Sequence, residues 1–298
     1  MVYIASKGGR NMGGVLVGIR QVLKNSVTQV LHTFTDGIIL KINKHVFKVS
    51  RDILLIAVYI PPINSPVYEN SDVKGIGIIE NVLCTMNVEE YCILLAGDLN
   101  ARVGVESDCI ESIPNLPMFN EYEFIFTVDP RVCDRKSLDS HVNSCGRNLL
   151  NLCKMYALYI LNGRCGSDKE EGNFTFVNSN GCSVIDYFIG NAELFDIIKD
   201  MFVDEEISSD HLPIVLKLNT FLIESNEMET LKSNKSDERF EGNFSVENIE
   251  LYKHNLSKAI ENNDVFAMCF NTDKPIDSII KKSFKISLLI AVDIYFLK

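Results

Sequence analysis

Short apolar runs that end at clusters of acidic, amide or imidazole side chains constrain the fold of this chain more than any other feature. Residues 92–96 run into Asp98, and His211 directly precedes the apolar run at 212–218. A third segment of the same kind lies between them and carries Asp186. Apolar runs of about four to eight residues are typical of strands buried in a sheet. The sequence therefore predicts a core sheet whose strand ends gather polar side chains.

Residues 1–218 alternate between strand patterns and helix patterns. Apolar residues at helical spacing predict helices, and the Asn-Gly pair at 180–181 is a strong hairpin signal. This mixture predicts one α/β domain of packed layers over residues 1–218. The predicted strands are 13–19, 37–42, 47–50, 53–60, 93–96, 159–161, 174–177, 183–189 and 212–218, with 47–50 and 53–60 forming a hairpin, and the predicted helices are 73–86, 149–157 and 192–200.

Two segments follow the predicted domain. Residues 219–242 are polar and indicate a linker. Residues 243–298 are expected to form a helical, spacer-like tail, because apolar residues in their first part recur at helical spacing. The longest apolar run of the tail, 286–297, contains Asp293 and is too short to cross a bilayer. We therefore expect no association with a membrane.

Composition restricts the partners and the compartment. The net charge is −11 at pH 7, whereas a strong nonspecific DNA binder usually carries a basic balance. Any nucleic-acid binding must therefore come from a local patch and from metal ions that offset the acidic groups. The nine cysteines form no CxxC pair, and the sequence starts without a secretory signal. These features predict reduced thiols in an intracellular protein, nuclear or cytoplasmic, that is not secreted.

Each polar motif has an ordinary structural explanation when it is taken alone. The Asp-Leu-Asn sequence at 98–100 can stabilise a turn after a strand. Asp186 can be a charge on an edge strand, the Asp-His pair at 210–211 can be a cap or a surface pair, and Tyr59 can be a core aromatic residue. The order of the motifs along the chain is more informative than any one of them.

Seven short motifs follow one another along residues 10–218. They are Gly-Gly-Val at 13–15, Val-Tyr-Ile-Pro-Pro at 58–62, Gly-Asp-Leu-Asn-Ala-Arg at 97–102, Gly-Arg-Asn-Leu-Leu at 146–150, Asn-Phe-Thr-Phe at 173–176, Ser-Val-Ile-Asp-Tyr at 183–187 and Ser-Asp-His at 209–211. In this order they resemble the endonuclease/exonuclease/phosphatase family, and within it the endonuclease domains of LINE-type retrotransposons, which accompany a reverse transcriptase. The resemblance implies an α/β fold of the DNase I-like kind, a sandwich of two mixed sheets with flanking helices. It also implies a metal-dependent hydrolase that cuts phosphodiester bonds in DNA.

The resemblance implies catalytic roles for five residues. Asp98 would orient and deprotonate the attacking water, and Asn100 would donate a hydrogen bond to a phosphate oxygen. His211 would contact the phosphate while Asp186 holds its tautomer, and Tyr59 would reach the scissile phosphate. A neighbouring carboxylate raises the pKa of a histidine. The imidazole would therefore be partly cationic, which helps to stabilise the charge of the transition state.

The resemblance also implies binding roles. Asp210 matches a carboxylate linked to the metal ion, which would be Mg²⁺ with Mn²⁺ as an alternative. Arg102, Thr175 and Ser183 match positions that bind nucleic acid through its phosphate backbone. The partner implied by these positions is DNA.

One departure from the family pattern concerns the metal. Family members carry a strand with an Asn and a strand ending in Gln-Glu before the Gly-Gly-Val segment, and this glutamate is their principal Mg²⁺ ligand. Only 12 residues precede Gly13 here, and they contain neither pattern. We therefore expect an N-terminally truncated domain that binds its metal weakly, if at all, and has reduced or no activity. The alternatives are a non-catalytic remnant or binding protein with this fold and, less favoured, a phosphatase of the same family.

Overall fold

The computed structural model describes residues 2–6, 14–19, 21–31, 37–110, 129–204, 209–220, 284–288 and 292–297. Internal contacts divide the chain into a first unit of Met1 with residues 3–221 and 284–298, and a second unit of Val2 with residues 222–283. The helices and strands described below belong to the first unit, apart from Val2 at the start of β1.

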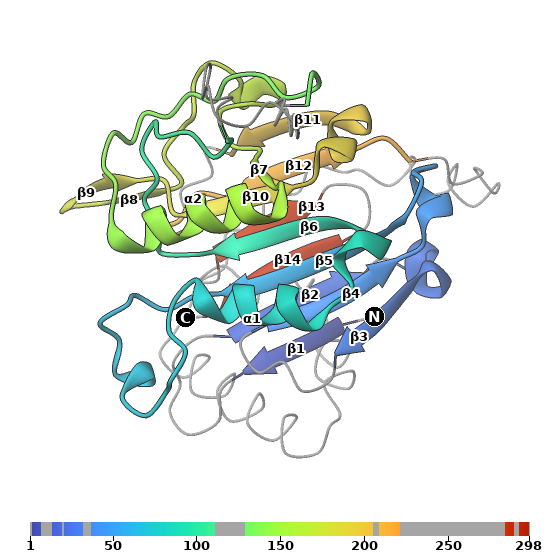
Figure 1. Ribbon diagram of the computed structural model, residues 1–298, viewed down its shortest axis with the longest axis horizontal. Coiled ribbons are helices and arrows are strands. Elements are labelled where there is room, and N and C mark those ends of the chain that lie inside the picture. The colour runs from blue at the N-terminus through green and yellow to red at the C-terminus, as the bar shows by residue number, and fades with distance from the viewer. Residues whose placement is uncertain are drawn as a thin grey trace, which may run out of the picture. The chain divides into compact units, whose positions relative to one another are not determined.

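A mixed sheet of six strands, called sheet one, contains many of the buried apolar side chains of the described residues, and Figure 1 shows its strands side by side. Its neighbouring strands β5 (Asp52–Tyr59) and β6 (Tyr91–Asp98) are parallel, and both are rich in isoleucine and leucine that lie almost completely buried. Such continuous apolar strands are typical of parallel pairs covered on both faces. The order across sheet one is β3 (Val27–Leu31), β4 (Gly37–Ile42), β5 (Asp52–Tyr59), β6 (Tyr91–Asp98), β10 (Asp186–Gly190) and β7 (Tyr159–Ile160).

Two helices pack on one face of sheet one (Figure 1). α1 (Gly77–Thr85) and α2 (Ser144–Tyr156) place apolar side chains such as Leu83 and Leu149 in one buried cluster with Leu54 of β5. Both helices bury the stripe that their apolar periodicity predicts. They correspond to the predicted helices at 73–86 and 149–157.

Local hydrogen bonds determine where α2 begins and ends. The side-chain oxygen of Asn143 accepts a hydrogen bond from the backbone N–H of Gly146 at 2.7 Å, which makes Asn143 the N-cap. At the other end Ala157 adopts a left-handed conformation with φ of 50°, and its N–H donates to the carbonyl oxygen of Cys153. The helix therefore starts earlier than the periodic residues alone predicted.

The other face of sheet one packs on a second six-stranded sheet, called sheet two. β2 contacts β4 and β5, and β12 contacts β10. The predicted fold class, an α/β sandwich of two sheets with flanking helices, is therefore confirmed. A separate two-strand ribbon is formed by β8 (Phe176–Asn178) and β9 (Gly181–Ser183) around the predicted Asn-Gly turn. The order across sheet two is β1 (Val2–Ser6), β2 (Gly14–Ile19), β14 (Val292–Leu297), β13 (Phe284–Leu288), β12 (Ile214–Leu218) and β11 (Ile198–Val203).

The helix predicted at 192–200 is wrong over its second half. A 3₁₀ turn covers only Ala192–Asp196, and β11 then begins at Ile198. β11 pairs antiparallel with β12 and buries Met201 completely. Pairing with a strand distant in the sequence therefore outweighs the local helical pattern.

The helical tail predicted over 243–298 is wrong where the structure describes it. β13 pairs in parallel with β12, and β14 pairs antiparallel with β2, so that both strands lie inside sheet two. The sequence of β14 is rich in valine, isoleucine, tyrosine and phenylalanine, which favour strands, and the neighbouring strands β2 and β13 offer it backbone partners. Residues 221–283, which include most of the predicted linker, lie outside the described residues. Among the helices that the structure describes, none has the length and apolar character needed to span a bilayer.

Candidate active site

Three strand ends of sheet one meet at a single position. β6 and β10 are antiparallel with Asp98 opposite Asp186, and β5 and β6 are parallel with Tyr59 opposite Asp98. Residues directly opposite one another on neighbouring strands have Cα atoms about 4.5–5.5 Å apart. The register of the sheet therefore places two carboxylate residues and one tyrosine side by side.

His211 joins the two carboxylates from the start of β12. Its Nδ1 lies 3.0 Å and 3.1 Å from the two carboxylate oxygens of Asp186, and its Nε2 lies 3.9 Å from Oδ2 of Asp98. Possible ligand atoms of the three residues all lie within 4.8 Å of one another. All three side chains are buried, with His211 the most exposed at 3%. In such surroundings electrostatic interactions are stronger than in water.

The ring of His211 is fixed from both sides. Phe176 packs against the imidazole with ring centroids 4.8 Å apart at an interplanar angle of 66°, and it also forms an isolated antiparallel bridge with His211. With Nδ1 bonded to the carboxylate of Asp186, the neutral ring carries its proton on Nδ1 and turns Nε2 toward Asp98.

Tyr59 remains a neutral hydrogen-bond donor. Burial, together with the charge of Asp98, raises the pKa of Tyr59 to about 12. The half-buried phenol therefore keeps its proton throughout the neutral range, and a neutral hydroxyl can donate to a phosphate oxygen.

The structure gives Asn100 a structural contact at the same strand end. Its backbone N–H donates to Oδ1 of Asp98 at 3.1 Å, and its side-chain amide donates to the carbonyl oxygen of Ile60 at 2.9 Å. The residue adopts a left-handed conformation with φ of 46°, which asparagine tolerates better than most residues. An amide nitrogen carries two hydrogens, so the bond to Ile60 is compatible with the predicted donation to a phosphate.

Thr175 and Ser183 are buried within the chain. Thr175 is completely buried, and its hydroxyl oxygen accepts hydrogen bonds from the backbone N–H groups of Ile185 and Asp186, each at 3.1 Å. Ser183 is 7% exposed, and its carbonyl oxygen accepts from the N–H of Thr175. Both residues are enclosed by the chain itself and bond within it, so these contacts give no support to the predicted contact with a phosphate backbone, which stays a prediction.

The guanidinium of Arg102 is bound to a buried carboxylate. It donates to the two oxygens of Asp139 at 2.6 and 2.8 Å. Burial alone would raise the pKa of Asp139, but the hydrogen bonds from Arg102 and from the amides of Val184 and His141 outweigh it and lower that pKa. Arg102 thus neutralises Asp139, and its side chain stays 30% exposed.

Asp210 lies apart from the group that its neighbour His211 joins. Its side chain is exposed, and its backbone carbonyl oxygen accepts from the N–H of Val177 at 2.8 Å. Among the described residues, the group with converging ligand atoms consists of Asp98, Asp186 and His211. Asp210 is not a member of this group, and the metal-ligand role predicted for it stays a prediction.

Two residues that support Asp186 were not predicted from the sequence. Asn162, which is buried, donates from its amide to the carbonyl oxygen of Asp186 and accepts from the N–H of Phe188, both at 3.0 Å. Asp139 accepts from the N–H of Val184 at 3.1 Å. Asn162 follows a predicted strand and resembles a turn residue, and Asp139 lies in an irregular stretch without periodicity. Only their tertiary contacts reveal their part in the site.

Carboxylate oxygens are the ligands preferred by Mg²⁺ and Mn²⁺. Asp98 supplies such a carboxylate, whereas both oxygens of Asp186 lie within hydrogen-bond distance of the ring of His211. Sites that hold Mg²⁺ through one or two carboxylates complete its coordination with water and substrate phosphates. The donor set therefore fits an ion held by Asp98, water and a substrate phosphate.

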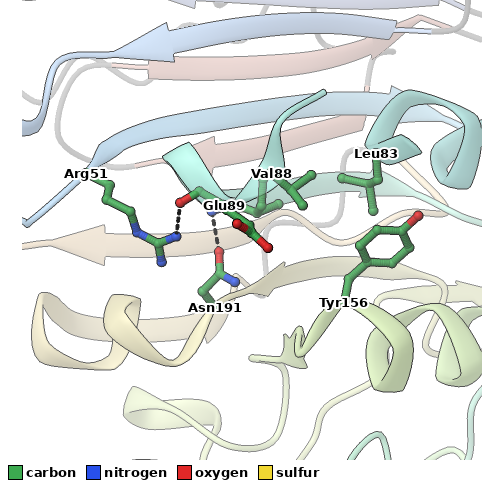
Figure 2. Close-up of a pocket in the computed structure, with 7 residues that line it drawn as sticks. Arg51, Leu83, Val88, Glu89, Tyr156 and Asn191 are labelled. Carbon is green, nitrogen blue, oxygen red and sulfur yellow. Dashed lines mark hydrogen bonds between the residues drawn. The ribbon is translucent and has the colours of Figure 1, made fainter. Parts of the chain in front are cut away.

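A cavity of about 150 Å³ lies among other residues of the same unit (Figure 2). Arg51 donates to the carbonyl oxygen of Glu89 at 2.7 Å at its rim, and the side chain of Asn191 accepts from the N–H of Ile93. Its lining includes none of the residues that the motifs select. This cavity is therefore separate from the predicted catalytic residues at the strand ends of sheet one.

Comparisons with known proteins give matches among solved structures alone. No protein-family model and no curated protein matches the chain. The endonuclease domain of TRAS1, a telomere-specific non-LTR retrotransposon, is 17% identical, with 71% of this chain and 77% of that chain covered and a TM-score of 0.43. A 3′-5′ exonuclease from Neisseria meningitidis, NExo, has the same identity and coverage with a TM-score of 0.40, as does a structure of NExo, there titled a 3′ phosphatase, bound to a product DNA hairpin. These likenesses concern the fold alone, and the chemistry of the site follows from its own side chains.

Proposed function

We propose that this chain is a metal-dependent phosphodiesterase of retrotransposon descent that cuts DNA at the strand ends of sheet one. The observation that carries the proposal is the buried group of Asp98, Asp186 and His211, whose ligand atoms lie within 4.8 Å of one another. Hydrolysis of a phosphodiester needs an acceptor for the proton of water and donors for the charge that develops on phosphate. Carboxylate, imidazole and the phenol of Tyr59 supply these functions.

Each side chain has a role that follows from its contacts. Asp98 accepts the proton of the attacking water. The protonated ring of His211, held by Asp186 through Nδ1, donates from Nε2 to an oxygen of the phosphate. The neutral phenol of Tyr59 donates to a second phosphate oxygen. A bound Mg²⁺ or Mn²⁺ ion would supply positive charge next to the phosphate.

The alternative function is a non-catalytic binding protein that keeps this fold. It is favoured by the net charge of −11 and by the contacts of Arg102, Thr175 and Ser183, which are made within the chain instead of at a DNA-facing surface. In that case the site would bind a divalent ion or DNA without cleaving it.

Nicking of supercoiled plasmid by the purified full chain, with Mg²⁺ or Mn²⁺, tests the proposal. We expect nicking that Asp98→Asn abolishes and that EDTA prevents. His141→Ala is the matched control, because the imidazole of His141 is exposed and belongs to none of the catalytic roles. Nicking that survives Asp98→Asn, or folded protein that binds Mn²⁺ in calorimetry without nicking, would overturn the enzymatic proposal. The second outcome would establish the binding alternative.

A further inference from the structure

The backbone that leads into Asp186 is held by buried side chains. The backbone N–H groups of residues 184, 185 and 186 each donate a hydrogen bond to a side-chain oxygen. The N–H of Val184 donates to Asp139, and the N–H groups of Ile185 and Asp186 both donate to the hydroxyl of Thr175. All three distances are 3.1 Å. The position of the Asp186 carboxylate therefore depends on the residues that accept these bonds.

Thr175 forms hydrogen bonds both with the segment that carries Asp186 and with the segment that carries His211. On one side its hydroxyl accepts from Asp186 itself, and its N–H donates to Ser183 at 3.0 Å. On the other side its carbonyl oxygen accepts from the N–H of Leu212 at 2.8 Å. Leu212 directly follows His211, so one buried residue joins the two segments that must align.

The residues that follow Thr175 extend this connection along the His211 segment. Phe176 bridges to His211 and packs its ring on the imidazole, and the N–H of Val177 donates to the carbonyl oxygen of Asp210 at 2.8 Å. A displacement of Thr175 would therefore move the ring of His211 and the carboxylate of Asp186 relative to each other. Two bonds of 3.0 and 3.1 Å between them leave little tolerance for such a shift.

We propose that Thr175 is a positioning residue, whose hydroxyl aligns the carboxylate of Asp186 with the imidazole of His211. The hydroxyl is required for this alignment, because its oxygen accepts hydrogen bonds from two buried N–H groups. A methyl group in its place would leave both N–H groups without an acceptor. The proposal deepens the proposed function, on which its kinetic consequence rests. It also assigns Thr175 a role that differs from contact with DNA, and the two roles predict different kinetics.

Two substitutions separate the hydroxyl from the shape of the side chain. Thr175→Val keeps the branched shape and removes the acceptor, whereas Thr175→Ser keeps the acceptor. Thr85→Val is the matched control, because the hydroxyl of Thr85 bonds only to the carbonyl of Val82 within α1 in the described contacts. Each variant is made in the full chain, and its fold is checked by circular dichroism.

The first measurement does not depend on catalysis. The ¹⁵N chemical shifts of the His211 ring, recorded at one fixed neutral pH, report which ring nitrogen carries the proton. We expect the wild type, Thr175→Ser and Thr85→Val to show Nδ1 protonated in the neutral ring, and both nitrogens protonated in the fraction of rings that is cationic. Thr175→Val should show a mixture of the two tautomers. A Thr175→Val spectrum identical to that of the wild type would overturn the proposal.

The second measurement uses nicking kinetics. We expect Thr175→Val to lower kcat by about 10²-fold, the usual effect of misplacing a catalytic group by about 1 Å, with KM for DNA little changed. Thr175→Ser should recover most of the rate. A higher KM with unchanged kcat would overturn the proposal in favour of a DNA contact, and Thr175→Ser as slow as Thr175→Val would show that the hydroxyl is irrelevant.

The design distinguishes failure of the proposed function from failure of the role proposed for Thr175. If the wild type shows no nicking, the proposed function fails, and the ring spectra alone decide the role of Thr175. If Thr175→Val does not fold, Thr175→Cys replaces it, because a thiol has a similar size and is a weak acceptor. A Thr175→Cys spectrum and rate equal to those of Thr175→Ser would then overturn the proposal.

Discussion

The buried ion pair between Arg164 and Asp108 supports the part of sheet one that holds the site. Arg164 donates to the two oxygens of Asp108 at 2.7 and 2.8 Å, and to the backbone carbonyl oxygens of Ile160 and Cys133. Ile160 belongs to β7, which pairs with β10, the strand that begins at Asp186. The two side chains of the pair are only 3% and 1% exposed, so water cannot replace their bonds.

Arg164→Met should therefore destabilise the protein strongly. Asp108 would keep its bond from the N–H of Ile160 at 2.7 Å and lose both bonds from the guanidinium. Removing one partner of a buried ion pair typically costs about 3–5 kcal/mol. A loss of 1 kcal/mol lowers the Tm of a domain of about 150–250 residues by about 2–4 °C. We expect the Tm to fall by roughly 6–20 °C.

Two further variants identify the cause. Arg164→Met combined with Asp108→Leu should recover most of the loss, because replacing both members of a buried pair by apolar residues is often neutral. Arg131→Met is the matched control. Arg131 also binds a carboxylate through two nitrogens, that of Asp129 at 2.6 and 2.8 Å, but its side chain is 36% exposed. An exposed pair contributes at most about 1 kcal/mol.

The effect should also depend on pH in a defined direction. Burial alone would raise the pKa of Asp108, but the hydrogen bonds and charge of Arg164 outweigh it and hold that pKa below its usual value. A lowered folded-state pKa contributes stability above the unfolded pKa of about 3.9, and this contribution is lost as the pH falls through the folded value. Without Arg164, burial raises the pKa of Asp108. Protonation of Asp108 at lower pH then removes the unpaired buried charge and reduces the loss of stability in the variant. The difference in stability between wild type and Arg164→Met should therefore be largest near neutral pH and shrink on acidification.

Thermal and urea unfolding followed by circular dichroism, at neutral pH and near pH 4.5, measure the Tm and the free energy of unfolding of all four proteins. A loss for Arg164→Met no larger than that for Arg131→Met would refute the reasoning. So would a double variant as unstable as the single one, because the penalty would then not come from an uncompensated buried charge.

Two other predictions concern the site and the tail. His211→Ala and Asp186→Ala should each lower the nicking rate by about 10²-fold or more, and the double variant should be little worse than either, because the two side chains act as one unit; losses that multiply would show that they act independently. Deleting residues 284–298 should abolish cooperative thermal unfolding and cause aggregation in size-exclusion chromatography, because the edges of β2 and β12 lose their partners; an unchanged Tm would show that β13 and β14 are dispensable.

Much of the fold follows from local patterns. β6 and β12 lie on the predicted runs at 93–96 and 212–218, since such runs are apolar over the whole length of a strand. The positions of β11 and β14 could not be predicted in the same way. Both strands depend on partners far along the chain, which periodicity within a short window does not report.

The site was predictable where a side chain lies at a strand end. Asp98 and Asp186 meet because β6 and β10 pair in register, and strand ends are visible in the sequence. The burial of Thr175 was not predictable, because it depends on how the segment at 183–186 returns to it. The same holds for Asn162, whose contacts with β10 arise only after folding.

The register of sheet one gives a physical reason to expect a positive charge in the proposed site. Asp98 and Asp186 lie directly opposite each other on neighbouring strands, an arrangement that is unfavourable for like charges. Both are buried, so water cannot screen their repulsion. The imidazole of His211, bonded to Asp186 and 3.9 Å from Asp98, can offset this repulsion when it is protonated. A substrate phosphate would add negative charge to the same place, and a divalent cation at Asp98 would compensate for it. The register of the sheet thus brings two carboxylates together at a buried position, and in the proposed function a protonated imidazole and a bound cation would each offset their charge.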